Sequence, residues 1–205
     1  MPPDTFERHT LVATLAEAPA TMLDVGGIKG ELAVFLPETE ITTINIEGED
    51  ADAHFNGDTL PFADDEFEVA VSLDVLEHIP NRDRALHFLE LGRVARRRVI
   101  VCCPLGTPEH VKAERDISEW HAAYTGRSHR FLEEHLENGL PTEAELESLA
   151  GSINGRCRIR YHGDFRAAND VFQSSVRLRQ KPSPKHVASY LRNKLDPRRN
   201  FELEE

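Results

Sequence analysis

The chain has 205 residues and a formal net charge of −12, with 36 acidic residues against 24 Lys and Arg. Its length is that of one ordinary domain, which can bury a core without disulfides or metals. The negative charge gives the surface as a whole no attraction for nucleic acid or for an anionic membrane. No apolar run reaches the roughly 20 residues of a membrane-spanning helix, so we expect a globular protein with no membrane partner.

The N-terminus and the cysteines favour a cytoplasmic protein. The opening residues, MPPDTFERHT, have neither the basic start nor the apolar core of a secretory signal. Cys102 and Cys103 are adjacent in an apolar run, and Cys157 stands alone. We expect all three to be reduced packing residues, because the number is odd and a free cysteine behaves as a small buried hydrophobe.

Capping and apolar spacing predict the first elements. In DTFERHTLVATLAEA, Asp4 and Glu7 have capping-box spacing, and the apolar residues that follow recur at helical intervals. TMLDV, residues 21–25, predicts a short buried strand that runs into a glycine-rich turn. ELAVFL, residues 31–36, predicts a helix behind that turn, which Pro37 ends.

The alternation of strands and helices predicts the fold class. Apolar runs predict strands at 41–46, 68–73 and 97–103, and residues 82–94 have the apolar spacing of a helix. Strands that alternate with helices form parallel βαβ units. We therefore expect an α/β fold: a single Rossmann-like domain with a doubly wound, mostly parallel sheet and helices on both faces.

The pattern is less regular after Pro104. Residues 105–140 mix polar and aromatic residues with helical patches, over a length typical of a lid or acceptor-binding insertion. A helix is predicted from Thr142 to Gly151, with Glu145 at the capping-box position. Residues 156–163 alternate like an edge strand.

The C-terminal part is basic. From Arg177 to Arg199 there are eight Lys and Arg against one acid, Asp196. Residues 172–180 fit a strand or a helix, 181–185 resemble a linker, and the apolar residues beyond it fit an amphipathic helix. We expect a main domain over 1–180 and a basic extension over 181–205, which is either a solvated segment or a surface for an anionic partner.

The glycine turn is the candidate ligand site. In a doubly wound sheet, ligands bind beyond the carboxyl ends of the strands, where glycines let a ligand approach the backbone closely. Dinucleotides and S-adenosylmethionine both use such a turn. The nicotinamide fingerprint Gly-x-Gly-x-x-Gly would need a glycine at Val25, which leaves a nicotinamide oxidoreductase as the last alternative.

The turn resembles the first motif of the class I S-adenosylmethionine-dependent methyltransferases, Asp-x-Gly-x-Gly-x-Gly. Asp24, Gly26 and Gly30 match the motif, whereas the middle glycine is displaced to Gly27 and Ile28 stands in its place. A β-branched residue tolerates positive φ poorly, so we expect Gly27 to take up the strain of the turn.

Further landmarks extend the resemblance over residues 21–104. Glu47 follows the second strand at the spacing of a carboxylate that binds the ribose hydroxyls. In the family, an Asp before a Leu-Pro-Phe turn accepts a hydrogen bond from the adenine amino group, which implies this role for Asp58. The resemblance also implies that the remaining contacts come from the backbone beside the ring and from the strand exit along the methionine portion, at Thr59, Leu60, Leu73, Asp74 and Val75.

The resemblance implies a cofactor, S-adenosylmethionine, and a reaction, methyl transfer to an O or N atom of a small molecule. A hydroxyl acceptor would gain from a base with a pKa near neutrality, so the catalytic candidates are His78 and, in the long segment, His110 and Tyr124. Asp116, Trp120, Tyr124 and Arg127 recur at the spacing of one helix face, which is either a lid or acceptor wall or the face of a surface or interface helix. The histidines lack the spacing of a metal site, so we expect no metal.

Two other functions stay open at the level of sequence. The first is a catalytically silent methyltransferase-like subunit that serves as an interaction module, which the displaced glycine favours. The second is a nucleic-acid methyltransferase that uses the basic C-terminal stretch, against which the acidic composition counts. Nucleic acid is therefore not the expected partner, and a homodimer is left open.

Overall fold

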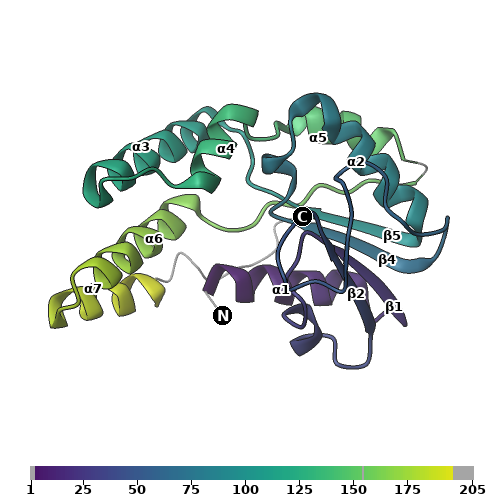
Figure 1. Ribbon diagram of the computed structural model, residues 1–205. Coiled ribbons are helices and arrows are strands. Elements are labelled where there is room, and N and C mark those ends of the chain that lie inside the picture. Colours follow the sequence, from purple (N-terminus) through teal and green to yellow (C-terminus); the bar gives the residue numbers. More distant parts are fainter. Residues whose placement is uncertain (1–2, 154, 196–205) are drawn as a thin grey trace. The chain divides into compact units, whose positions relative to one another are not determined.

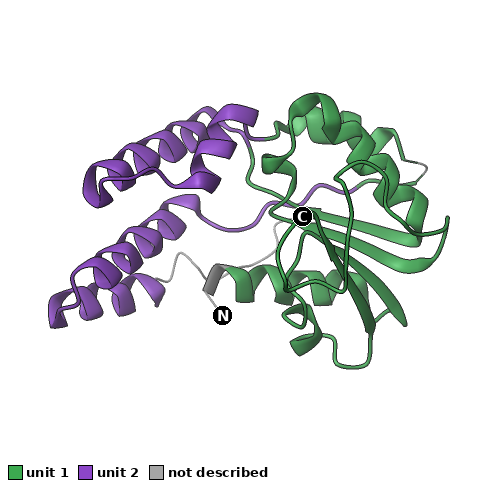
Figure 2. Ribbon diagram, in the orientation of Figure 1, with its two compact units in different colours: residues 1–105, 141–157 green, residues 106–140, 158–205 purple. Residues whose placement is uncertain are grey.

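The structure, a computed structural model, describes residues 3–153 and 155–195. It divides into two compact units, which we treat separately (Figure 2). Unit 1 consists of residues 1–105 and 141–157, and unit 2 of residues 106–140 and 158–205. Among the described residues, no helix combines the length and the apolar character that crossing a membrane requires.

Unit 1 contains a five-stranded sheet in the order β3-β2-β1-β4-β5 (Figure 1). All four pairs of neighbouring strands are parallel. The strands are β1 (Thr21–Val25), β2 (Glu40–Asn45), β3 (Ala53–His54), β4 (Phe67–Leu73) and β5 (Ala95–Cys102). The chain first builds outward from β1 through β2 to β3 and then returns to place β4 on the other side of β1. The expected doubly wound α/β fold is confirmed, and its switch point lies between β1 and β4.

Helices cover both faces of the sheet. Successive side chains of β1 point to opposite faces, and because apolar residues point to both, each face has to be covered. Met22 packs in one apolar cluster with Val12 of α1 (Pro3–Ala16). The next residue, Leu23, packs in a second cluster with Leu91 of α2 (Asn81–Val94). Both β1 side chains are fully buried, so the strand that leads into the glycine turn is held from two sides.

An ion pair joins α2 to α5 (Glu143–Gly151). The guanidinium of Arg84 is fully buried and lies 2.9 Å from the carboxylate of Glu145. Its Nε also donates to the carbonyls of Leu76 and Ile79, at 3.1 and 3.0 Å. Arg84 therefore fixes the turn that follows β4 as well as α5. The predicted start of α5 is confirmed, since the Thr142 side chain accepts from the backbone N–H of Glu145.

Three details of the structure differ from the sequence expectations. Behind the glycine turn there is no α-helix but a single 3-10 turn, η1 (Leu32–Val34), because the left-handed Gly30 and Pro37 leave only six residues between them. The edge strand expected at 156–163 is absent except for an isolated bridge at Tyr161. The two-residue strand β3 was not predicted, since so short a strand has no periodicity.

Unit 2 is helical. Its helices are α3 (Pro108–Thr125), α4 (Arg130–Asn138), α6 (Phe165–Gln180) and α7 (Pro184–Lys194). Side chains of Thr107, Asp164 and Ser183 cap the starts of α3, α6 and α7. Residues 172–180 are thus helical, and α6 and α7 lie side by side (Figure 1). Of the expected insertion over 105–140, residues 106–140 belong to this unit.

We predict that Arg84→Leu lowers the free energy of unfolding by roughly 3 kcal/mol, because it removes the cation that pairs with the carboxylate of Glu145 and the donor to two carbonyls. Urea denaturation would measure the loss. Arg82→Leu is the matched control on the same helix, since that side chain is 84% exposed and pairs with its neighbour Asp83. Equal unfolding midpoints for the two variants would contradict the role given to Arg84.

Candidate functional site

The turn after β1 starts with Gly26, whose conformation and surroundings both require glycine. Its φ is +83°, and a Cβ on this residue would overlap the Val75 side chain. Its N–H donates to the carbonyl of Ile44 at 2.8 Å, which extends the β1–β2 ladder by one residue. Gly30 also has positive φ, +85°, but open space lies around it. The strain of the turn is therefore carried at its two ends.

Gly27 serves a different purpose from the one expected. Its φ is not left-handed, but the carboxylate of Asp24 lies so close to its backbone that a Cβ there would collide with all three carboxylate atoms. The expectation that Gly27 absorbs backbone strain in place of Ile28 is wrong. Ile28 keeps an ordinary φ, and its side chain is half exposed. The displaced glycine is thus explained by a buried carboxylate.

Asp24 is the buried acid of the site, with 2% of its surface exposed. Burial, reinforced by the negative charge of Glu31, raises the pKa of Asp24 from 3.8 to about 7. Within the described part of the chain, its Oδ1 has no hydrogen-bond partner. A buried oxygen without a partner is costly, so this atom fits a site that a polar ligand completes.

Lys29 connects the glycine turn to the segment between β2 and β3. Its Nζ lies 2.5 Å from Oδ1 of Asp52, and Oδ2 of the same carboxylate accepts from the backbone N–H of Thr43 at 3.0 Å. These two hydrogen bonds keep the pKa of Asp52 below its usual value. The backbone N–H of Lys29 also donates to the carbonyl of Asp50. The glycine turn is therefore attached to the loop between β2 and β3.

Glu47 lies in that loop. β2 ends at Asn45, two residues before it, and the Glu47 side chain is exposed. The Asn45 side chain accepts from the N–H of Ile46 and makes a long hydrogen bond of 3.4 Å to the carbonyl of Gly27. The structure therefore places Glu47 beyond the carboxyl end of β2, the strand next to β1 and its glycine turn.

The loop with Asp58, Thr59 and Leu60 is held by α2. Leu60 is buried, its N–H donates to Glu90 at 2.8 Å, and its carbonyl accepts from Arg93 at 2.9 Å. Because both backbone groups of Leu60 are engaged, they are not available to a bound base. Asp58 and Thr59 are exposed, and the Asp58 carboxylate accepts from the side chain of Asn56 at 3.2 Å.

The exit of β4 bends sharply at Asp74, which has a positive φ of 53°. Its N–H donates to the carbonyl of Cys102 at 2.9 Å, and its carboxylate lies 2.7 Å from Nε of Arg8 on α1. A non-glycine residue in this conformation is strained, and such strain gathers at functional sites. Since Val75 packs against Gly26, the exits of β1 and β4 are in direct contact.

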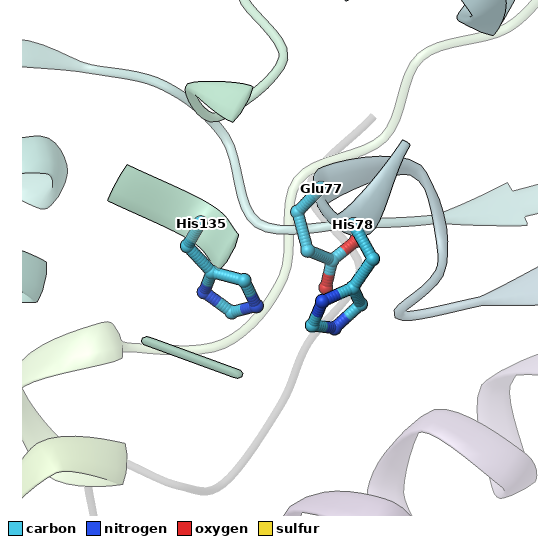
Figure 3. A group of neighbouring side chains, drawn as sticks. All are labelled: Glu77, His78 and His135. Atoms are coloured by element: carbon cyan, nitrogen blue, oxygen red, sulfur yellow. The ribbon is translucent and has the colours of Figure 1, made fainter. Parts of the chain in front are cut away.

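His78 follows in the 3-10 turn η2 (Leu76–His78). A ring nitrogen of His78 and a carboxylate oxygen of Glu77 lie within 4.8 Å of each other. Figure 3 draws both side chains on this turn; the third labelled side chain, His135, belongs to unit 2. Two ligand-type atoms from consecutive residues do not by themselves define a metal site.

The other two catalytic candidates lie on α3 of unit 2. The His110 ring stacks on Phe165, with ring centroids 4.4 Å apart, and the Tyr124 ring stacks on Trp120 at 5.2 Å. The two candidates are about four helical turns apart, or roughly 21 Å at 1.5 Å per residue. They therefore cannot act on the same acceptor atom.

The helix face proposed as an acceptor wall is only partly formed. Arg127 lies beyond the end of α3, where Gly126 caps the helix with a φ of +77°. Asp116 pairs with Lys112 on the exposed surface, and Arg177 of α6 lies 5.3 Å from the centre of the Trp120 ring.

A serine and a histidine meet beneath the site. The hydroxyl of Ser72 on β4 lies 2.9 Å from Nε2 of His87 on α2. Ser72 is fully buried, and only 8% of His87 is exposed, so no substrate reaches the hydroxyl. Burial lowers the pKa of His87 from 6.5 to about 4. The pair is a buried packing contact and not a nucleophilic dyad.

Sequence reasoning missed the residues that support the site, which are Arg8, Glu90 and Arg93. Arg93 donates to the carbonyls of Leu60 and Phe62 and pairs with Glu90. The contacts of Arg93 with the two carbonyls, and of Glu90 with the N–H of Leu60, join residues 30 or more positions apart. The contact of Arg8 with Asp74 spans a still longer separation. No local pattern carries such a signal.

We predict opposite effects of Asp24→Asn and His87→Gln on the pH dependence of stability in the cofactor-free protein. Native Asp24 keeps a proton that the unfolded chain releases above about pH 4, so its contribution falls as pH rises toward 7. Below about pH 6.5 the unfolded chain binds a proton at His87, whereas native His87 stays neutral down to about pH 4. The contribution of His87 to the free energy of unfolding therefore rises with pH from about 4 to 6.5.

Between about pH 4 and 6.5 the two contributions to the free energy of unfolding have opposite pH dependences and cancel. Each variant removes one of them, so the pH dependence of the other becomes measurable. Relative to the unsubstituted protein, the unfolding free energy of Asp24→Asn should rise with pH by up to about 1.4 kcal/mol per unit. That of His87→Gln should fall by a similar amount. Urea denaturation at pH 5 and pH 6 would measure both slopes, and two slopes equal to the parent's would show that neither group is shifted.

Residues 23–103 match the model of a family described as "Methyltransferase domain". The matched segment begins in β1 and ends just after β5. It contains the glycine turn, the loop with Glu47, the loop with Asp58, the exit of β4 and η2. None of the curated proteins matches the chain in sequence.

Three solved structures resemble the chain in fold. A Galdieria sulphuraria protein, provisionally named a sarcosine dimethylglycine methyltransferase, has a TM-score of 0.56 at 16% identity, over 96% of this chain and 80% of that one. The magnesium protoporphyrin IX methyltransferase of Synechocystis PCC 6803 with bound S-adenosylhomocysteine gives 0.53 at 13%, over 78% and 76%. A SAM-dependent methyltransferase from Methanosarcina mazei gives 0.52 at 19%, over 72% and 84%.

These identities show the fold alone, whereas the family match covers the residues of the site. A turn that excludes side chains at Gly26 and Gly27, and a buried oxygen of Asp24 without a partner among the described residues, fit the family's cofactor. Residues 23–103 therefore form a methyltransferase domain, and the site that they build fits S-adenosylmethionine as its cofactor.

Proposed function

We propose that this methyltransferase transfers a methyl group to an oxygen or nitrogen atom of a small-molecule acceptor. The observation that carries the proposal is the direct contact between the exits of β1 and β4, where Val75 packs against Gly26 above the buried Asp24. In this fold, a ligand binds at the switch point, beyond the carboxyl ends of these strands.

Two acidic residues would hold the adenosine portion of the cofactor. Glu47 would accept hydrogen bonds from the ribose hydroxyls, and Asp58 from the adenine amino group. Thr59 would supply a backbone contact to the base, since the backbone of Leu60 is already bound to Glu90 and Arg93. Leu60 would then act as the buried anchor of this loop.

The methionine portion would lie along the exits of β1 and β4. The backbone of Gly26, Gly27 and Gly30 would face its charged groups, with Asp24 beneath the turn. Leu73, Asp74 and Val75 would line the other side. The ion pair of Arg8 with Asp74 supports this arrangement, because it fixes the strained residue at the exit of β4.

The cofactor supplies an activated methyl group on a sulfonium, and the chain positions the acceptor for an in-line displacement. Positioning provides most of the rate for an acceptor that is already nucleophilic. A hydroxyl acceptor also needs a base, and His78 is our candidate because it follows Val75 by one short turn. His110 and Tyr124 stay predictions from the sequence, and their rings are engaged in stacking.

Two of the similar structures support a small acceptor. Their names give sarcosine and dimethylglycine, or magnesium protoporphyrin IX, as what they methylate. Transfer of a labelled methyl group to a panel of small amines, hydroxyl compounds and carboxylic acids would test the acceptor class. Labelling of nucleic acid or protein alone would contradict it.

We predict that S-adenosylhomocysteine binds to the protein in calorimetry and that Glu47→Ala and Asp58→Ala each weaken binding by about 10- to 100-fold, the loss expected for a charge-assisted hydrogen bond. Glu38→Ala is the matched control, since Glu38 is an exposed acid of the same unit that precedes β2. Unchanged affinity in both site variants would overturn the roles given to Glu47 and Asp58. The match to the methyltransferase domain family would still stand.

A further inference from the structure

The helix α7 packs against α6 with its polar side. The half-buried side chains within α7 are His186, Ser189, Tyr190 and Asn193, which share one face at helical spacing. The Asn193 side chain donates to the carbonyl of Asp170 on α6 at 2.9 Å. Figure 1 shows the two helices side by side. The face that a surface helix normally turns to solvent is therefore the face that α7 packs against its neighbour.

The apolar residues of α7 point to solvent instead. Val187, Leu191 and Leu195, the residue that caps the helix, are 43%, 49% and 78% exposed. They recur every four residues and so form one stripe along the helix. A helix in an ordinary globular protein buries such a stripe. We therefore expect a partner surface that covers the stripe of α7.

Basic residues border the stripe on both sides. At about 100° per residue, Lys194 lies just beyond one edge of the stripe, and Lys185 and Arg192 lie beyond the other. All three side chains are exposed, and α7 contains no acidic residue. Residues 158–195 as a whole carry nine Lys and Arg against Asp164 and Asp170, although the chain is strongly acidic.

We propose that α7 is a membrane-surface helix that lies on an anionic lipid bilayer, with its apolar stripe among the acyl chains and its basic borders at the lipid phosphates. An aliphatic stripe between two basic borders, on a helix too short to span, is the pattern of interfacial helices. This inference goes beyond the proposed function, and its test does not require methyl transfer.

Charge complementarity selects this occupant over two others. Nucleic acid would use the basic borders but not an aliphatic stripe, because single strands stack on aromatic side chains. A protein groove would have to present acidic residues along both edges. A lipid surface supplies negative charge on both sides of the stripe at once, and long basic side chains reach it while their stems stay apolar.

Flotation of the full-length protein with vesicles tests the proposal. We expect binding to phosphatidylcholine vesicles that contain about 30% phosphatidylglycerol, and at least about tenfold weaker binding to phosphatidylcholine alone, since each basic residue near an anionic surface adds attraction. Raising the salt from about 50 to about 500 mM should weaken the anionic binding several-fold, because it shortens the screening length.

Leu191→Ser should reduce the partition to anionic vesicles by about tenfold, because it removes apolar area that the bilayer would bury. Leu89→Ser on α2 is the matched control: that side chain is 47% exposed but lies in acidic unit 1. Both positions are exposed, so both variants should fold, and circular dichroism checks this.

A second readout reports insertion directly. The chain has a single tryptophan, Trp120, which lies on α3 against Arg177. In Leu191→Trp, the added indole should shift its emission to shorter wavelength when anionic vesicles are added, whereas the parent protein should show no such shift. An unshifted emission with vesicles that bind the protein would place α7 away from the bilayer and overturn the proposal.

Three other outcomes would also overturn it. The first is no binding to anionic vesicles even at low salt. The second is an equal loss of binding in Leu191→Ser and Leu89→Ser. The third is salt-sensitive binding to a single-stranded RNA with no binding to vesicles, which would assign the basic face to nucleic acid.

Discussion

The carboxylate of Asp24 lies against the backbone of Gly27, and the geometry of the glycine turn after β1 depends on this close approach. It accounts for a glycine at a position whose φ any residue could adopt, and it leaves the usual middle position of the motif to Ile28. It also forces an acid into a buried place, where burial raises its pKa to about 7. The structure thus explains why the glycines of this motif depart from the family pattern. A side chain on Gly26 would overlap Val75, and a side chain on Gly27 would overlap Asp24.

The loops that meet this turn are held by side chains from other elements and not by their own sequences. Lys29 and Asp52 fasten the turn to the loop after β2, and Arg8 fastens the exit of β4 to α1. Glu90 and Arg93 fasten the loop that contains Leu60 to α2. Each contact is an ion pair or a charge-assisted hydrogen bond that leaves a backbone segment in place. Such support keeps binding groups in position before a ligand arrives, which reduces the ordering cost of binding.

The sequence predicted what local patterns encode. Strands β1, β2, β4 and β5 and helices α2 and α5 follow from apolar runs, spacing and the Thr142 cap, and their order predicts the doubly wound sheet. The expected helix after Gly30 failed, because the left-handed residue and Pro37 limit its length, and 156–163 alternates without pairing as a strand. The ordered landmarks from Asp24 to Val75 lie at or beyond the carboxyl ends of the strands, where the family resemblance predicts the site. Arg8, Glu90 and Arg93 were not predictable, since their roles arise from contacts between distant segments.

Net charge is a poor guide to the partners of such a chain, because it averages over distances at which charges are screened. The Debye length at physiological salt is about 8 Å, which is much shorter than the 11-residue helix α7, roughly 16 Å long at 1.5 Å per residue. A surface that approaches α7 within this distance senses Lys185, Arg192 and Lys194, and no acidic residue of the same helix opposes them. The exclusion of an anionic membrane holds for the average surface but not for this helix, where basic charge and exposed aliphatic area coincide. Composition decides what a whole surface does, and the arrangement of a few side chains decides what one face does.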